Sequence, residues 1–124
     1  MTTSYKPLTE EEMDHHTNPV CHIVLFKFKA EPDEETLRKL LNTIRKNIPG
    51  LISLYFGKER PNIFKGKTDR THGYTHALFS RHVNARALEI YQKHPDHVKL
   101  GQFFQKHSAA PPIAVDYVAI NAKL

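Results

Sequence analysis

The sequence predicts an α+β domain in which a four-stranded antiparallel sheet carries its helices on one face. Short apolar runs with many β-branched and aromatic residues alternate with longer helical patterns, in the order β-α-β-β-α-β. The length of 124 residues suits a single domain with a modest core. A lone cysteine, Cys21, excludes a disulfide framework within the chain and indicates a reducing, cytoplasmic compartment.

The first nineteen residues differ from the rest of the chain in charge. One lysine and four acids leave them a net charge of −3, whereas seventeen basic and nine acidic residues leave residues 20–124 at +8. Two prolines and few apolar residues also indicate a flexible acidic leader over residues 1–19. Within it, Thr9 and Glu12 have the spacing of a helix capping box. We therefore expect one folded domain over residues 20–124.

The positive charge of that domain is scattered along the sequence. No block of five or six like charges and no nucleic-acid-binding motif occurs, so we expect a solvated surface and no nucleic-acid partner. An acidic small-molecule ligand is compatible with this charge. No apolar run approaches the roughly 20 residues that cross a bilayer, so we expect no membrane association. Residues 58–70 are polar and basic and are predicted to form a long loop.

Residues 21–29 and 33–47 are predicted to form the first strand and the first helix. The strand has apolar side chains on both faces, so both faces are expected to be covered. Asp33 is placed to cap the helix, and leucine and isoleucine recur along it at three- and four-residue spacing. Pro49 and Gly50 then end the helix.

The remaining elements follow the same plan. Asn84 is placed to cap a second helix that ends near Lys93, and Pro95 breaks this helix and restarts a helical segment through Phe104. Three further strands are expected over residues 51–57, 73–80 and 113–120. This order is the ferredoxin-like plan, which places the helices on one face of the sheet.

The sheet face away from the helices is predicted to be too apolar to remain in contact with water. On that face we expect four apolar side chains, those of Val24, Phe26, Phe28 and Leu78. We therefore expect a homodimer in which two copies pack through the open sheet face. His22 and His76 would point into the space between the sheet and its partner, or into a cavity beside it.

Several stretches of the sequence together resemble one known family, the stress-responsive A/B barrel (Dabb) domain. The family's opening strand is similar to the stretch from His22 to Lys29. Its later motifs resemble Ile48-Pro49-Gly50 with the strand that ends in Gly57, then Gly73-Tyr74-Thr75-His76, and finally Tyr91-x-x-His94-Pro95-x-His97. The motifs occur in the family's order over about residues 21–118, which makes the combination specific.

The resemblance implies a homodimeric α+β barrel whose pocket supports chemistry without a cofactor or a metal. The family includes a hydroxynitrile lyase and plant polyketide cyclases, and the chain resembles the cyclases. In them a tyrosine and a histidine at the positions of Tyr91 and His97 are catalytic, and histidines that match His22 and His76 line the pocket. We extend the predicted lining to four neighbouring residues, Val24, Phe26, Leu78 and His94.

An aldol-type cyclisation of a carbonyl compound needs a base and a hydrogen-bond donor. The imidazole of His97 is partly neutral at cytosolic pH, so it can take a proton from a carbon between two carbonyls. The hydroxyl of Tyr91 can stabilise the oxyanion that forms. The resemblance therefore favours a small, cofactor-free acid–base enzyme with a polyketide cyclase-like reaction on a carbonyl compound.

Two other functions stay open at this point. The family also holds stress-responsive proteins without an established reaction, so the chain can be a non-catalytic dimeric barrel. A lyase or a monooxygenase can use the same pocket with other substrates. The individual residues also have structural roles open to them: Tyr91 can pack its ring under the sheet, and His94 can cap a helix. The remaining domain histidines, His72, His82 and His107, are expected to be solvated.

Overall fold

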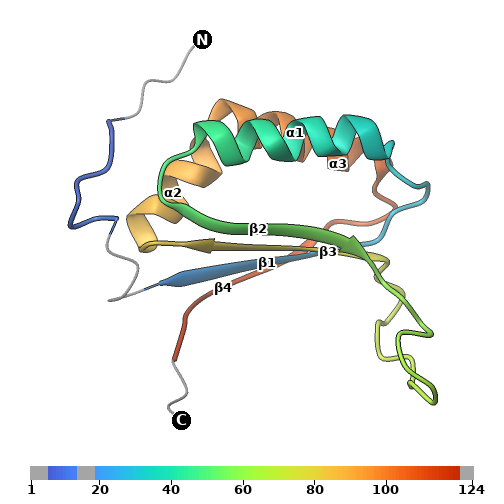
Figure 1. Ribbon diagram of the computed structural model, residues 1–124. Helices are drawn as coiled ribbons and strands as arrows, with labels where there is room; N and C mark the ends of the chain where they lie inside the picture. The colour runs from blue at the N-terminus through green and yellow to red at the C-terminus, as the bar shows by residue number, and fades with distance from the viewer. Residues whose placement is uncertain (1–5, 14–18, 121–124) are drawn as a thin grey trace.

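The computed structural model describes residues 6–13 and 19–120. The elements are β1 (Val20–Phe26), α1 (Glu34–Asn47), β2 (Leu51–Lys58), β3 (His76–His82), α2 (Ala85–Lys93), α3 (Pro95–His107) and β4 (Ile113–Val118). The strands form one antiparallel four-stranded sheet in the order β2-β3-β1-β4. All the helices cover the same face of this sheet (Figure 1). The predicted fold class is therefore confirmed.

Side-chain caps begin the helices where the sequence places them. The Asp33 carboxylate accepts a hydrogen bond from the backbone N–H of Thr36 at 2.9 Å and begins α1. The Asn84 side chain accepts one from the N–H of Ala87 at 2.9 Å and begins α2. Pro95 lies in the first turn of α3, where its missing N–H would have no intrahelical partner. Both predicted caps are therefore confirmed.

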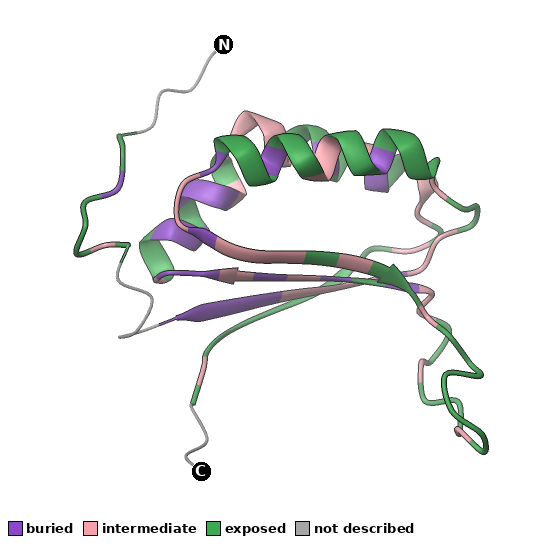
Figure 2. Ribbon diagram, viewed as in Figure 1, coloured by how far each residue is buried: buried purple, intermediate pink, exposed green. Residues whose placement is uncertain are grey.

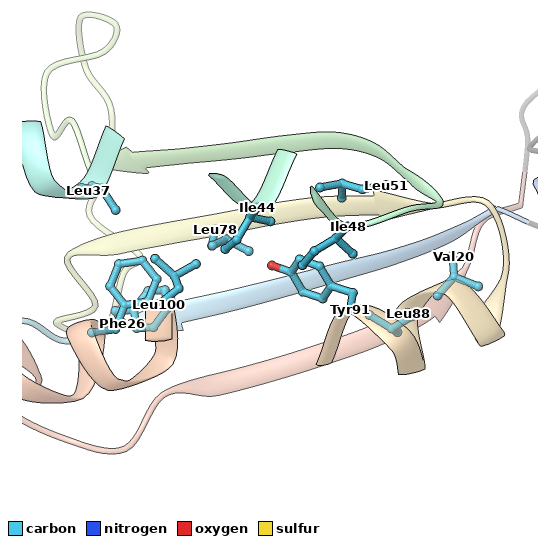
Figure 3. Packing of buried hydrophobic residues seen from close by; sticks show 11 residues of the cluster. Val20, Phe26, Leu37, Ile44, Ile48, Leu51, Leu78, Leu88, Tyr91 and Leu100 are labelled. Atoms are coloured by element: carbon cyan, nitrogen blue, oxygen red, sulfur yellow. The ribbon is translucent and has the colours of Figure 1, made fainter. Parts of the chain in front are cut away.

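The main hydrophobic core fills the space between the helices and the inner face of the sheet (Figure 3). Ile44 of α1 and Leu100 of α3 are almost wholly buried, and they share the cluster with Phe26 of β1 and Leu78 of β3. Tyr91 of α2 belongs to the same cluster and has no exposed surface. Each large apolar side chain buried in this way contributes roughly 1.5–3 kcal/mol. The core therefore fixes the three helices against the two central strands.

The orientation of the sheet corrects one sequence prediction. The residues placed on the open face by the sequence, Val24, Phe26, Phe28 and Leu78, instead pack in the core beneath the helices, so that prediction is wrong. Alternation separates the two faces of a strand, but it does not tell which face receives the helices. The outer face carries the alternate residues of each strand, and four of these are exposed: Tyr55, Ile113, Val115 and Tyr117.

The described part of the leader lies against the domain (Figure 2). Leu8 is buried in a small cluster with Ala87 and Ile90 of α2. The capping box between Thr9 and Glu12 is formed, with both hydrogen bonds at 3.1 Å. The Glu12 carboxylate also lies 2.7 Å from Nε of Arg86. Residues 6–13 are thus docked on the start of α2, while the rest of the predicted leader, residues 1–5 and 14–18, lies outside the described residues.

The long connection between β2 and β3 contains the predicted basic loop. It covers residues 59–75 and protrudes at one end of the sheet (Figure 1). Its apolar residues Ile63 and Phe64 are exposed. Among the helices that the structure describes, none combines the length and the hydropathy that a membrane span requires.

Candidate active site

A cavity of about 660 Å³ opens between the inner face of the sheet and helices α2 and α3. This volume is typical of a site for a small organic molecule. Six of the eight predicted site residues line it: His22, Val24, Phe26, Leu78, Tyr91 and His97. Its apolar wall is completed by Leu100 and Phe104. The structure therefore gathers most of the predicted residues around one space.

His97, in the first turns of α3, lies half-buried beside Tyr91, with 4.5 Å between the ring centroids. Its Nδ1–H donates to the backbone carbonyl of Gln92 at 3.2 Å, because a carbonyl oxygen can only accept. The neutral ring therefore presents the lone pair on Nε2, which no described residue engages. Burial, followed by the proximity of His22, lowers the pKa of His97 to about 4. The side chain is thus a neutral hydrogen-bond acceptor at physiological pH.

Tyr91 projects from α2 into the same space. Its ring packs edge-on toward His22, with 6.0 Å between the ring centroids. Burial raises the pKa of the Tyr91 phenol to about 12, and the Ser80 hydroxyl nearby opposes this rise. The phenol therefore keeps its proton at any physiological pH. No described residue forms a hydrogen bond with its oxygen.

His22 of β1 is fixed by two polar partners. Its Nδ1–H donates to Oδ1 of Asp116 on β4 at 2.5 Å. The side-chain amide of Gln92 lies 3.4 Å from its Nε2 and can donate to that atom. His22 is 3% exposed, whereas Asp116 is 50% exposed, so the carboxylate joins a buried imidazole to the solvent-facing edge of the cavity. Both nitrogens of His22 are thus occupied.

His76 lies away from this cavity, at the opposite end of β3 from His82. It is buried against Phe28, its Nδ1 is 2.7 Å from Oγ1 of Thr75, and its Nε2 is 3.2 Å from a carboxylate oxygen of Glu31. It lines a second cavity of about 690 Å³ between the basic loop and the outer face of the sheet. His76 therefore does not line the same cavity as His22, Tyr91 and His97, contrary to the sequence prediction.

His94 connects α2 to α3 and also lies outside the lining of the first cavity. Its Nδ1 accepts a hydrogen bond from the N–H of Asp96 at 3.1 Å, which caps α3. The cap agrees with the structural role considered for His94 in the sequence. No group of three His, Cys, Asp or Glu side chains within residues 6–13 and 19–120 is arranged to hold a metal ion.

Sequence reasoning missed the polar residues around the predicted histidines. Asp116 is the one charged residue in an otherwise apolar strand, which was a signal for a buried partner. Gln92 sits one residue after Tyr91 and gave no signal. His82, expected to be solvated, is fully buried, and its Nε2 lies 2.8 Å from Oγ of Ser80. That expectation is wrong because His82 follows the inner face of β3, two residues after Ser80.

The family comparison agrees with this fold. The sequence profile described as "Stress responsive A/B Barrel Domain" (Dabb) matches residues 20–119, so the chain belongs to the Dabb family. A curated relative is the stress-response A/B barrel domain-containing protein DABB1 of Arabidopsis thaliana, which is 32% identical over 107 residues. The match covers 83% of this chain and 48% of the relative, so the chain spans about half the length of that protein.

Solved structures similar to this chain share its fold. A dimeric ferredoxin-like protein of unknown function from Thermobifida fusca has a TM-score of 0.64 at 24% identity, with 82% of this chain and 92% of that chain covered. The hydroxynitrile lyase from Passiflora edulis has a TM-score of 0.66 at 17% identity, covering 86% and 96%. SnoaB, a cofactor-independent oxygenase from Streptomyces nogalater, has a TM-score of 0.62 at 12% identity, covering 84% and 95%. At these identities the likeness establishes the ferredoxin-like fold.

Proposed function

We propose that the chain is a cofactor-free acid–base enzyme that cyclises a carbonyl compound by an aldol-type reaction. The observation that carries this proposal is the convergence of His22, Tyr91 and His97 on one cavity whose remaining wall is largely apolar. A neutral acceptor and a protonated donor are thus both among the residues that line this cavity. This pairing is what proton removal beside a carbonyl and stabilisation of the resulting oxyanion require.

His97 is the proposed base. Its Nδ1–H is held by the Gln92 carbonyl, so Nε2 faces the reaction with its lone pair free. His22 is less suited to this role because Gln92 and Asp116 already occupy its two nitrogens. A developing negative charge on the substrate would favour protonation of His97 and so offset its low pKa.

Tyr91 is the proposed oxyanion donor. Its pKa of about 12 keeps the phenol protonated, and its hydroxyl has no competing partner among the described residues. The low polarity of the surrounding core strengthens a hydrogen bond to a charged oxygen. In this role the tyrosine binds the enolate oxygen more strongly than the ground-state carbonyl.

The proposed reaction moves one proton and forms one carbon–carbon bond. His97 takes a proton from a carbon between two carbonyls, and the enolate carbon attacks another carbonyl carbon of the same molecule. The protonated His97 then returns this proton to the resulting alkoxide, directly or through solvent, which gives the neutral aldol product and restores the neutral imidazole. The apolar wall of Phe26, Leu100 and Phe104 suits a substrate with an alkyl or aryl portion beside its carbonyls.

A lyase on the same site is the second candidate. The free Nε2 of His97 can also accept the proton of a substrate hydroxyl, which starts cleavage of the neighbouring carbon–carbon bond. The fold likeness to a hydroxynitrile lyase is compatible with this direction of reaction. Product identity distinguishes the two, since a lyase releases two molecules and a cyclase releases one ring. A monooxygenase on the same fold would incorporate oxygen into its product.

We also propose that the outer sheet face forms a homodimer. Val115 and Tyr117 of β4 and Tyr55 of β2 are exposed on that face, and an apolar surface of this kind is rarely left open to water. The dimeric state named for the protein from Thermobifida fusca supports the proposal. A cytoplasmic location, an acidic ligand and a separate domain over residues 20–124 stay predictions; the buried free thiol of Cys21 is compatible with the first.

Turnover of linear poly-β-ketone substrates by the wild-type chain and by two variants tests the enzymatic proposal. His97→Ala and Tyr91→Phe should each lower kcat/KM by about 100-fold or more. Matched controls are His72→Ala, on the exposed loop, and Tyr55→Phe, on the outer face; both should keep the wild-type rate. Wild-type rates in folded His97→Ala and Tyr91→Phe variants would refute the assignment.

A further inference from the structure

Two buried polar residues of β3, Ser80 and His82, have no role in the proposed reaction. Ser80 and His82 of β3 are both fully buried, and Oγ of Ser80 lies 2.8 Å from Nε2 of His82. The His82 ring packs against the Tyr91 ring, with 4.6 Å between centroids, and His82 does not line the cavity. Among the side-chain nitrogen and oxygen atoms of the described residues, only Nδ1 of His82 and the hydroxyl oxygen of Tyr91 are buried without a hydrogen bond. Such unpaired atoms are rare in native proteins and require an explanation.

The charge state of His82 limits what this group can do. Burial first, and then the proximity of His22, lower the pKa of His82 to about 4, although the carboxylate of Asp116 opposes the change. His97 lies near enough to lower it further. The ring is therefore neutral at physiological pH and carries one N–H and one lone pair. It can act as a hydrogen-bond donor through only one nitrogen.

The Ser80 hydroxyl, which contacts the His82 imidazole, can also donate to the Tyr91 phenol. A hydroxyl can accept one hydrogen bond while it donates another, so Ser80 can accept from His82 and donate to Tyr91 at the same time. Its presence opposes the rise in the Tyr91 pKa, which is the sign expected of a donor to the phenolate oxygen. In the structure the Ser80 hydroxyl has not yet closed a hydrogen bond with Tyr91. Hydrogen bonds of this kind often tighten only when ligand is bound.

We propose that Ser80 and His82 are positioning residues for Tyr91, forming a donor chain that runs from His82 Nε2–H to Ser80 Oγ and from the Ser80 hydroxyl to the Tyr91 oxygen. The Tyr91 proton is then directed into the cavity, toward the substrate oxygen. Hydrogen bonds in such a chain polarise one another, so each strengthens the next. The role in catalysis rests on the proposed function, whereas the contact between Ser80 and His82 is already present in the resting protein.

The tautomer of His82 tests the direction of the chain without any substrate. Long-range ¹H–¹⁵N NMR spectra of the protein labelled at histidine report which ring nitrogen carries the proton. The expected result at neutral pH is a proton on Nε2 of His82, with Nδ1 bare. A proton on Nδ1 would overturn the proposal, because Ser80 would then have to donate to His82 and could not donate to Tyr91.

The acidity of Tyr91 tests the link to the phenol. Tyrosines are replaced by 3,5-difluorotyrosine, whose phenol titrates well below that of tyrosine, and the Tyr91 signal is identified in ¹⁹F NMR from its loss in Tyr91→Phe. Ser80→Ala should raise the midpoint of the Tyr91 titration by about half a pH unit to one pH unit, the size expected for one lost hydrogen bond. His82→Phe should raise it by a smaller amount.

Two control variants separate this role from a general loss of packing. His82→Gln retains an N–H that can donate to Ser80, so it should restore most of the wild-type midpoint. Val83→Ala removes buried volume next to His82 but outside the chain, and it should leave the midpoint unchanged. An unchanged midpoint in folded Ser80→Ala would overturn the proposal. Loss of turnover in Tyr91→Phe has no bearing on these readouts, so the proposed function can fail separately.

Discussion

His22 and Asp116 form a cross-strand pair that closes one side of the cavity. Nδ1 of His22 on β1 lies 2.5 Å from Oδ1 of Asp116 on β4, and the two residues face each other in the antiparallel register. Because a carboxylate only accepts, the pair places a proton on Nδ1 of His22. The first and last strands of the chain thus jointly set the orientation of one imidazole in the candidate site.

Loss of the Asp116 charge should weaken catalysis more than folding. Asp116→Asn keeps a group of similar size beside His22 but removes the negative charge that holds the imidazole in one tautomer. We expect kcat/KM to fall by about tenfold or more, because the imidazole of His22, which lines the cavity beside Tyr91, would lose its fixed orientation. The control is Asp69→Asn, on the exposed loop. Equal values of kcat/KM in Asp116→Asn and Asp69→Asn would show that the His22–Asp116 pair has no role in catalysis.

The activity should persist to unusually low pH for a reaction that uses a histidine base. The pKa of His97 is lowered to about 4, and a base acts only in its deprotonated form. We therefore expect kcat/KM to be constant above about pH 5 and to fall about tenfold for each pH unit below about pH 4. A fall that is already complete near the ordinary histidine pKa of about 6.5 would show that another group is the base.

Removal of the Tyr91 hydroxyl should separate stability from activity. The hydroxyl is buried without a hydrogen bond in the structure, so Tyr91→Phe deletes an unsatisfied polar group and leaves the ring in place. We expect the free energy of unfolding to stay within about 1 kcal/mol of wild type, or to rise. Urea denaturation measures this change. A loss of several kcal/mol would indicate a structural hydrogen bond at Tyr91.

A charge on the outer sheet face should dissociate the proposed dimer. Val115 is 51% exposed on the outer face of the edge strand β4, opposite Ile23 of β1 in the register. Val115→Glu would bury an unpaired carboxylate between the two copies, so we expect a monomer in sedimentation velocity where wild type is a dimer. Glu89→Gln, on the exposed side of α2, should remain dimeric. A wild-type monomer, or a dimeric Val115→Glu variant, would contradict the assigned interface.

The elements of the fold were predictable because their signals are local. Asp33 and Asn84 cap helices whose periodicity is visible in the sequence, and Pro95 marks the start of α3. The choice of inner sheet face was not predictable, since Val24 and Leu25 are both apolar neighbours on one strand. It is decided by tertiary packing against α1 and α3, which alternation does not encode.

The candidate site was predictable in part, because one sequence motif contains two of its residues. Tyr91 and His97 lie six residues apart, so one short stretch brings both to the cavity. His76 was misplaced because its distance from His22 depends on the register between β1 and β3, which pairs it with Phe26 instead. Asp116 and His82 were missed for the same reason: their partners come from pairing and burial, and neither can be derived from spacing alone.

Deuterium exchange at a carbon acid tests the central claim most directly, because it requires only proton removal in the cavity. The probe is nonane-2,4-dione, a β-diketone with an alkyl tail, whose binding and exchange at the carbon between the carbonyls are followed together by NMR in D₂O. We predict that hydrogen at this position exchanges faster with the wild-type chain than in buffer alone, and that His97→Ala gives no such acceleration. Binding without faster exchange, or equal acceleration by His97→Ala, would contradict the claim that His97 removes a proton from a carbonyl substrate.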